Sequence, residues 1–80
     1  MTEDLDLLLN RIGMRVLRRR QELGLSQGDL AERLGIQRTN IGRIERGEQN
    51  VTLGTLCKIA RELDVTVEAL IVAEPPTPPA

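Results

Sequence analysis

Apolar residues recur at intervals of three and four along most of the chain, which is the spacing of one face of an α-helix. The first series predicts a helix from about residue 5 to residue 23, and it consists of Leu5, Leu8, Leu9, Ile12 and Val16. Gly24 follows, and glycine readily takes the left-handed backbone conformation that ends helices. Several arginines near the end of this helix favour its negative pole.

Two short helices are expected next, joined by a tight turn. Ser26 can cap the first of them, and Asp29 three residues later resembles a capping box. Gly35 ends this helix after about two turns. The second is expected from about Arg38 to Arg46, and the apolar residues expected to fill the angle between the two helices are Leu30, Leu34, Ile36, Ile41 and Ile44.

Two more helices complete the expected fold. Thr52 is the expected cap of one, whose inner face would consist of Leu53, Leu56, Ile59, Ala60 and Leu63. Cys57 lies on the apolar side of this helix and is expected to be a small buried hydrophobe. Thr66 is the expected cap of a short last helix, and the proline-rich stretch beyond it cannot be helical. The pattern predicts an all-α protein: one domain over residues 1–73 and a flexible Pro-rich tail over residues 74–80.

The composition narrows the possible functions. The 80 residues include one Cys, no His and no aromatic residue. One Cys cannot form an internal disulfide, and the usual zinc ligands are missing. We therefore expect no metal, no cofactor and no enzymatic activity. No apolar run is long enough to span a membrane, and the acidic first residues do not resemble a secretory signal, so we expect a cytoplasmic protein.

The charge is unevenly distributed along the chain. The net charge is −1, yet residues 11–20 carry +5 and residues 1–10 carry −3. Positive charge is thus concentrated although the total is not basic. Arg15, Arg18 and Arg19 belong to this cluster, and they fit either a solvated helix end or contacts to phosphates.

Residues 27–46, QGDLAERLGIQRTNIGRIER, form a helix-turn-helix pattern. Ala31 is small where the helices must approach each other, and Gly35 permits the turn. The outer face of the second helix offers two guanidiniums, an amide and a hydroxyl, which are groups that read base edges in the major groove of DNA. The expected base-reading residues are Arg38, Thr39, Asn40 and Arg43.

The chain resembles the lambda-repressor-like (XRE-type) helix-turn-helix family, most closely in LGLSQGDLAERLG, RTNIGRIERGEQNVTL and KIARELDVTVEAL. The resemblance implies a compact five-helix DNA-binding domain that regulates transcription as a homodimer on an inverted-repeat operator. The second of these segments is similar to the controller proteins of restriction–modification systems. The expected partners are operator DNA, a second copy of the chain and RNA polymerase.

The resemblance also implies roles for individual residues. Arg20 and Glu45 match an internal ion pair that ties the first helix to the recognition helix. Gln27 matches a residue that contacts a phosphate and braces the recognition helix. The full set of expected phosphate contacts is Ser26, Gln27, Gln37, Arg46 and Asn50.

Several points stay open at this stage. Gln37 replaces the Ser or Thr that relatives carry before the recognition helix, so it either caps that helix poorly or contacts DNA. Gly42 costs about 1 kcal/mol relative to Ala inside a helix, which indicates a close approach to DNA or to a neighbouring helix.

Leu70, Ile71 and Val72 are consecutive and cannot all be covered internally, so they are the expected dimer interface. The alternative function is a protein-binding module such as the antitoxin of a toxin–antitoxin pair.

Overall fold

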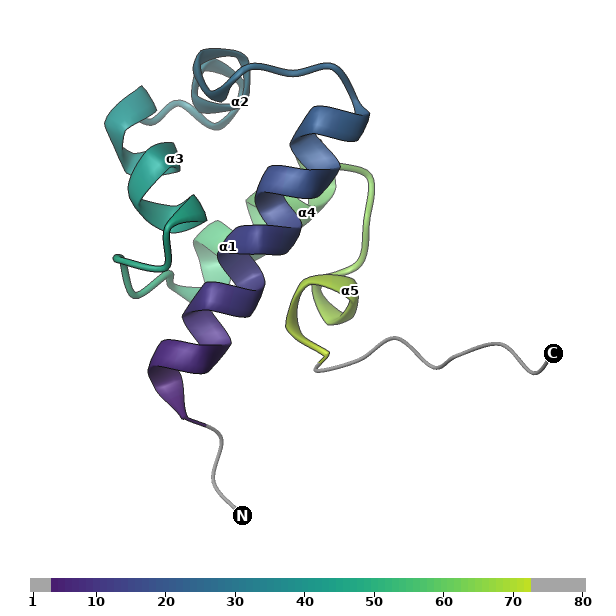
Figure 1. The fold of residues 1–80 in the computed structure, drawn as a ribbon. Helices are drawn as coiled ribbons and strands as arrows, with labels where there is room; N and C mark the ends of the chain where they lie inside the picture. The colour runs from purple at the N-terminus through teal and green to yellow at the C-terminus, as the bar shows by residue number, and fades with distance from the viewer. Residues whose placement is uncertain (1–3, 73–80) are drawn as a thin grey trace, which may run out of the picture.

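The computed structural model describes residues 4–72, and within them the regular structure is entirely helical (Figure 1). The end of the expected domain at residue 73 and the expected Pro-rich tail over residues 74–80 lie outside the described residues. The five helices are α1 (Leu5–Glu22), α2 (Gln27–Leu34), α3 (Arg38–Glu45), α4 (Leu53–Glu62) and α5 (Val67–Ile71). The all-α fold class is confirmed, and each helix lies close to its expected place.

Local side-chain bonds explain where most of these helices begin. Ser26 and Asp29 form the expected capping box at the start of α2. Thr52 and Thr66 accept backbone N–H bonds at the starts of α4 and α5. Gly35 follows α2 with φ +70°, a left-handed conformation that turns the chain sharply toward α3.

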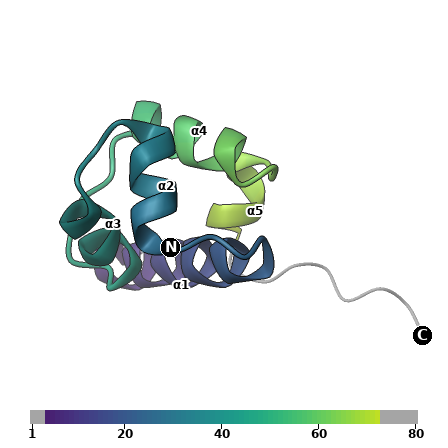
Figure 2. The same ribbon diagram turned by 90° about the horizontal axis from the view of Figure 1, so that it is seen from above.

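The core lies between the helix-turn-helix and the other three helices. Figure 2 shows α2 between α3 and α4, with α1 running across one side of the bundle and α5 on the side away from α3. Leu30 of α2 and Ile41 and Ile44 of α3 are at most 1% exposed, as the apolar pattern predicted. The remaining buried apolar residues include Val16, Ala31, Leu56, Ile59, Leu63 and Leu70.

The α4 face differs from the expectation at two residues. Leu53 is 73% exposed and Cys57 is also exposed, so the predictions that both are buried are wrong. The two lie four positions apart and therefore share one stripe of the helix. The buried stripe is instead Leu56, Ile59 and Ala60, continued by Leu63 at the helix end. The first helix shows the same effect at Leu5, which is 51% exposed at the start of α1.

A row of arginines on α1 bonds to the ends of α4 and α5. Arg19 Nε donates to the carbonyl oxygen of Leu63 at 2.8 Å, and Arg11 Nη1 donates to that of Ile71 at 2.8 Å. Arg15 Nη1 donates to the carbonyl oxygen of Ala69 in α5 and to that of Val72, which follows the helix. Helix ends leave carbonyl oxygens without partners, and these side chains satisfy several of them. These three members of the basic cluster therefore hold the bundle together.

Gly13 brings the backbones of α1 and α3 into direct contact. A Cβ at this position would lie 2.5 Å from the carbonyl oxygens of Ile44 and Glu45. The apolar pattern along the chain did not point to Gly13. Its only signal is a glycine in the middle of a helix, where glycine is unfavourable.

We expect Gly13→Ala to lower the free energy of unfolding by about 1–3 kcal/mol or more, because backbone atoms cannot move aside as a side chain can. Ala alone would favour the helix by about 1 kcal/mol, so the sign of the change is diagnostic. Urea denaturation measures it. Gly54→Ala is the control, since the nearest atom to its added Cβ is 4.0 Å away. Equal stabilisation by both substitutions would contradict this close contact.

Candidate nucleic-acid interface

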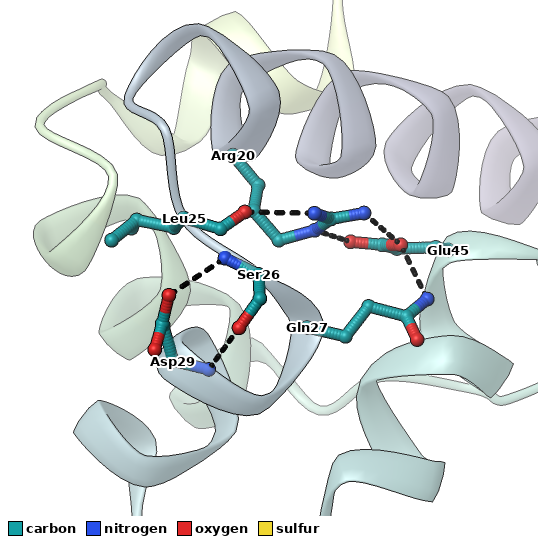
Figure 3. Close-up of polar contacts among 6 residues, drawn as sticks. All are labelled: Arg20, Leu25, Ser26, Gln27, Asp29 and Glu45. Atoms are coloured by element: carbon teal, nitrogen blue, oxygen red, sulfur yellow. Dashed lines mark hydrogen bonds and ion pairs between the residues drawn. The ribbon is translucent and has the colours of Figure 1, made fainter.

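A buried polar network joins α1, α2 and α3 (Figure 3). Arg20 Nε lies 2.6 Å from Glu45 Oε2, and Arg20 Nη2 donates to Glu45 Oε1 at 3.0 Å. Gln27 Nε2 donates to the same Oε1 at 3.0 Å, and Arg20 Nη1 donates to the carbonyl oxygen of Leu25 at 2.8 Å. The Arg20 and Glu45 side chains are only 9% and 4% exposed. The hydrogen bond that Arg20 donates to Glu45, aided by the negative charge of that carboxylate, raises the pKa of Arg20 above its ordinary value.

This network orients the third helix relative to the other two. Glu45 lies in the last turn of α3, Arg20 lies in the last turn of α1, and Gln27 is the first residue of α2. A bidentate guanidinium–carboxylate pair fixes direction as well as distance. The ion pair expected from the resemblance is therefore present, and Gln27 braces α3 through the same carboxylate.

The start of α2 is held by its capping box. Ser26 Oγ accepts from Asp29 N at 3.0 Å, and Asp29 Oδ2 accepts from Ser26 N at 2.9 Å (Figure 3). The hydrogen bond from the Ser26 N–H lowers the pKa of the Asp29 carboxyl. The Ser26 hydroxyl is an acceptor in this cap, so its own proton can still be donated to an anion.

The outer face of α3 is exposed and basic. Arg38, Thr39 and Arg43 are exposed, whereas Asn40 is half-buried in the first turn. Gln37 precedes the helix as its N-terminal cap, and its side chain makes no capping hydrogen bond. Gln37 is therefore a poor cap, as its replacement of Ser or Thr predicted, and its exposed side chain remains available for a contact to DNA. A shallow hollow on this face is lined by Gln27, Arg38, Thr39, Gly42, Arg43 and Arg46.

Arg46 is paired with Glu48 just beyond α3. Arg46 Nε donates to Glu48 Oε2 at 2.8 Å, and both side chains are at least half exposed. This hydrogen bond lowers the pKa of the Glu48 carboxyl and raises that of Arg46. Asn50, in the loop between α3 and α4, is exposed. The structure thus places Arg46 beside the expected base-reading residues, although the sequence grouped it with the phosphate contacts.

The three residues expected at the dimer interface differ in exposure. Leu70 is only 2% exposed and packs in the core, so the expectation that it is available to a second copy is wrong. Its side chain points inward because α5 docks against α1 and α4. Ile71 is half-buried and Val72, which follows the last residue of α5, is 42% exposed.

The arginines of the basic cluster on α1 also differ from one another. Arg18 is exposed, while Arg15 and Arg19 bond to helix ends.

Among residues 4–72, there is no helix with the length and apolar character of a membrane span. The same residues contain no group of three or more His, Cys, Asp or Glu side chains placed to hold a metal ion.

Residues 16–70 match the helix-turn-helix family HTH_3, and this range covers most of the core, the buried network and the exposed face of α3. The chain belongs to this helix-turn-helix family. Its fold is shared with solved members: the restriction-modification controller protein C.AhdI from Aeromonas hydrophila superposes with a TM-score of 0.75 at 38% identity. That match covers 79% of this chain and 96% of C.AhdI.

Three further comparisons concern a control protein and a transcriptional regulator. Control protein C.SmaI of Serratia marcescens is 48% identical over 50 residues, covering 62% of this helix-turn-helix chain and 60% of C.SmaI. The transcriptional regulator SinR of Bacillus subtilis is 38% identical over 61 residues, covering 75% of this chain and 55% of SinR. A crystal structure of SinR in complex with DNA has a TM-score of 0.69 and covers 74% of this chain and 95% of that one. The chain thus spans 60% or less of these curated relatives.

Proposed function

We propose that this helix-turn-helix protein is a sequence-specific DNA-binding transcriptional regulator. It acts in the cytoplasm and catalyses no reaction. The observation that carries the proposal is the exposed basic face of α3, held in a fixed orientation by the buried Arg20–Glu45–Gln27 network. An orientation fixed before binding lowers the cost of ordering the interface. The crystal structure of SinR, a structural neighbour, in complex with DNA supports this proposal.

The side chains of α3 supply the chemistry for reading bases. Arg38 and Arg43 can each donate two hydrogen bonds to guanine, and Asn40 can pair with adenine. Thr39 can place its methyl group against thymine. These four residues lie in the first two turns of an eight-residue helix, so they can enter one stretch of major groove together.

Residues around the helix ends would hold the DNA backbone. Ser26, Gln27 and Gln37 lie at the starts of α2 and α3, where free N–H groups and the helix dipole attract phosphate. Asn50 lies in the loop that follows α3. These contacts position the protein on the duplex and make its affinity depend on salt.

The regulator would act as a homodimer through Ile71 and Val72, which remain partly uncovered at the end of α5. Two copies related by a two-fold axis present α3 to adjacent major grooves, about 34 Å apart, on an inverted repeat. The similarity to C.SmaI and C.AhdI supports a role as the controller of a restriction–modification system. The dimer bound to its operator would either block RNA polymerase or contact it.

Selection of bound duplexes from a randomised pool, at about 0.15 M salt, tests this function. We expect enrichment of an inverted repeat whose half-sites are about one helical turn apart. Affinity for the selected duplex should then fall steeply with rising salt, because each phosphate contact releases counterions. No enrichment from folded protein, together with a flat salt response, would reject DNA binding and favour a protein-binding module such as an antitoxin.

A further inference from the structure

The guanidinium of Arg46 lies over a part of α3 that has no side chain of its own. Gly42 is buried, although Arg38, Thr39 and Arg43 around it are exposed. A Cβ on Gly42 would lie 3.1 Å from Arg46 Nη1, which is tighter than ordinary contact. The guanidinium of Arg46 therefore folds back along α3 and covers Gly42.

Gln27 closes the other side of the same place. Its Nε2 would lie 3.7 Å from that Cβ, and the same nitrogen donates to the buried carboxylate of Glu45. The two alternatives for Gly42 were a close approach to DNA or to a neighbouring helix. The structure shows two side chains against Gly42, one from Arg46 just beyond α3 and one from Gln27 of α2. A side chain larger than hydrogen at position 42 would crowd Arg46 and contact Gln27.

Glu48 holds Arg46 in this position from one edge of the guanidinium. It accepts a hydrogen bond from Nε at 2.8 Å. Within residues 4–72, neither Nη1 nor Nη2 of Arg46 forms a hydrogen bond. The two terminal nitrogens are thus available together as a fork, which is the donor geometry that matches O6 and N7 of guanine.

Arg46 also lies in line with the expected reading residues. Arg38, Gly42 and Arg46 are spaced four apart, so they follow one stripe along α3, and all three line the same hollow as Thr39 and Arg43. Without the folded-back guanidinium this stripe would have a gap at Gly42. Because long helical side chains point toward the N-terminus of their helix, Arg46 can fill that gap from its end.

We propose that Arg46 is a base-reading residue and not a phosphate contact, and that Glu48 is its positioning residue, with Gly42 providing the space. The proposal rests on the proposed function, since it assigns a specificity role within the same surface. The base-reading surface then extends from the first turns of α3 to Arg46, the residue that follows the helix. Arg46 would favour guanine at the base pair that it contacts.

The test uses the full chain and the duplex selected by the wild-type protein. Each base-pair position of the half-site is replaced in turn, and the same replacement is made in both half-sites of the duplex. The affinity for each duplex is then measured with the wild-type protein and with the variants Arg46→Ala, Glu48→Gln and Gly42→Ala. We expect Arg46→Ala to lose discrimination at one G·C pair by about tenfold or more while preferences elsewhere persist. Glu48→Gln and Gly42→Ala should lose part of that discrimination at the same pair.

Two control variants separate a specific effect of Glu48 and Gly42 on Arg46 from a general effect of lost charge or added bulk. Glu68→Gln removes an exposed negative charge from α5, and Gly54→Ala adds a methyl group to α4, so both should leave base preferences unchanged. Gly42→Ala should keep or raise the melting temperature, since Ala favours helices, while it lowers discrimination. A variant that only disturbed the fold would lower both.

Other outcomes would overturn the inference. Uniformly weaker binding of Arg46→Ala to every duplex, with a salt slope reduced by about one, would show a phosphate contact. Normal preferences in Glu48→Gln, with altered ones in Arg46→Ala, would remove the positioning role of Glu48. In both cases the wild-type protein still selects an operator and the proposed function stands. Failure of the wild-type protein to select any duplex would instead reject the proposed function and this inference with it.

Discussion

Replacing Glu45 with Ala is expected to lower the free energy of unfolding by about 3–5 kcal/mol, because it leaves the buried guanidinium of Arg20 without its counter-charge. Gln27 also loses its acceptor. Small domains have total stabilities of about 5–15 kcal/mol, so this variant would retain little margin. Thermal unfolding followed by circular dichroism should show a drop in melting temperature of roughly 15 °C or more.

Two further variants make this expectation specific. Glu48→Ala breaks an ion pair in which both partners are at least half exposed, and it should leave the melting temperature nearly unchanged. The double variant Arg20→Met with Glu45→Leu removes both buried charges and should recover much of the loss, since apolar residues of similar size often replace buried pairs without cost. A melting temperature for Glu45→Ala equal to that of Glu48→Ala would show that the Arg20–Glu45 pair does not stabilise the bundle.

The double variant Arg38→Ala with Arg43→Ala is expected to abolish the preference for the operator while the helical content stays unchanged. Both side chains are exposed, so their loss leaves the core intact. Each bidentate contact to a base discriminates by about 1–3 kcal/mol, so removing two should reduce the preference for operator over random duplex by roughly thirtyfold or more. Competition binding with the selected duplex measures this ratio.

The matched control is Arg33→Ala with Arg61→Ala. These two arginines are also exposed, but they line a hollow between α2 and α4, away from the outer face of α3. The control removes the same charge and should lower affinity for all duplexes slightly without changing the preferred sequence. A double variant at Arg38 and Arg43 that kept wild-type preferences would show that the reading surface lies elsewhere.

The helix boundaries follow from short stretches of sequence. The capping box of Ser26 and Asp29, the caps at Thr52 and Thr66 and the left-handed Gly35 depend on neighbours within four residues. Such interactions act in the same way whatever the rest of the fold does, so a local pattern predicts them. The spacing of Leu30, Ile41 and Ile44 similarly predicted the inner faces of the helix-turn-helix.

The candidate site was predicted in its residue types, and partly in its arrangement. The pattern of α3 identified the exposed face, and the family resemblance identified the pair between Arg20 and Glu45, which are 25 residues apart. The pattern did not show that Arg46 returns over Gly42. That position depends on Glu48 and Gln27 together, and no spacing rule within one helix describes such an arrangement.

By itself, the sequence determined the five helices, their ends and the face of α3 that meets solvent, because short-range hydrogen bonds and apolar periodicity govern these features. Only the tertiary structure decided that Leu53 and Cys57 are exposed and Leu70 is buried, since which of two adjacent stripes is covered depends on where neighbouring helices dock. It likewise decided that Gly13 lies against the carbonyl oxygens of α3. Contacts between distant segments require the packed bundle, and a pattern along one helix does not contain the position of the next.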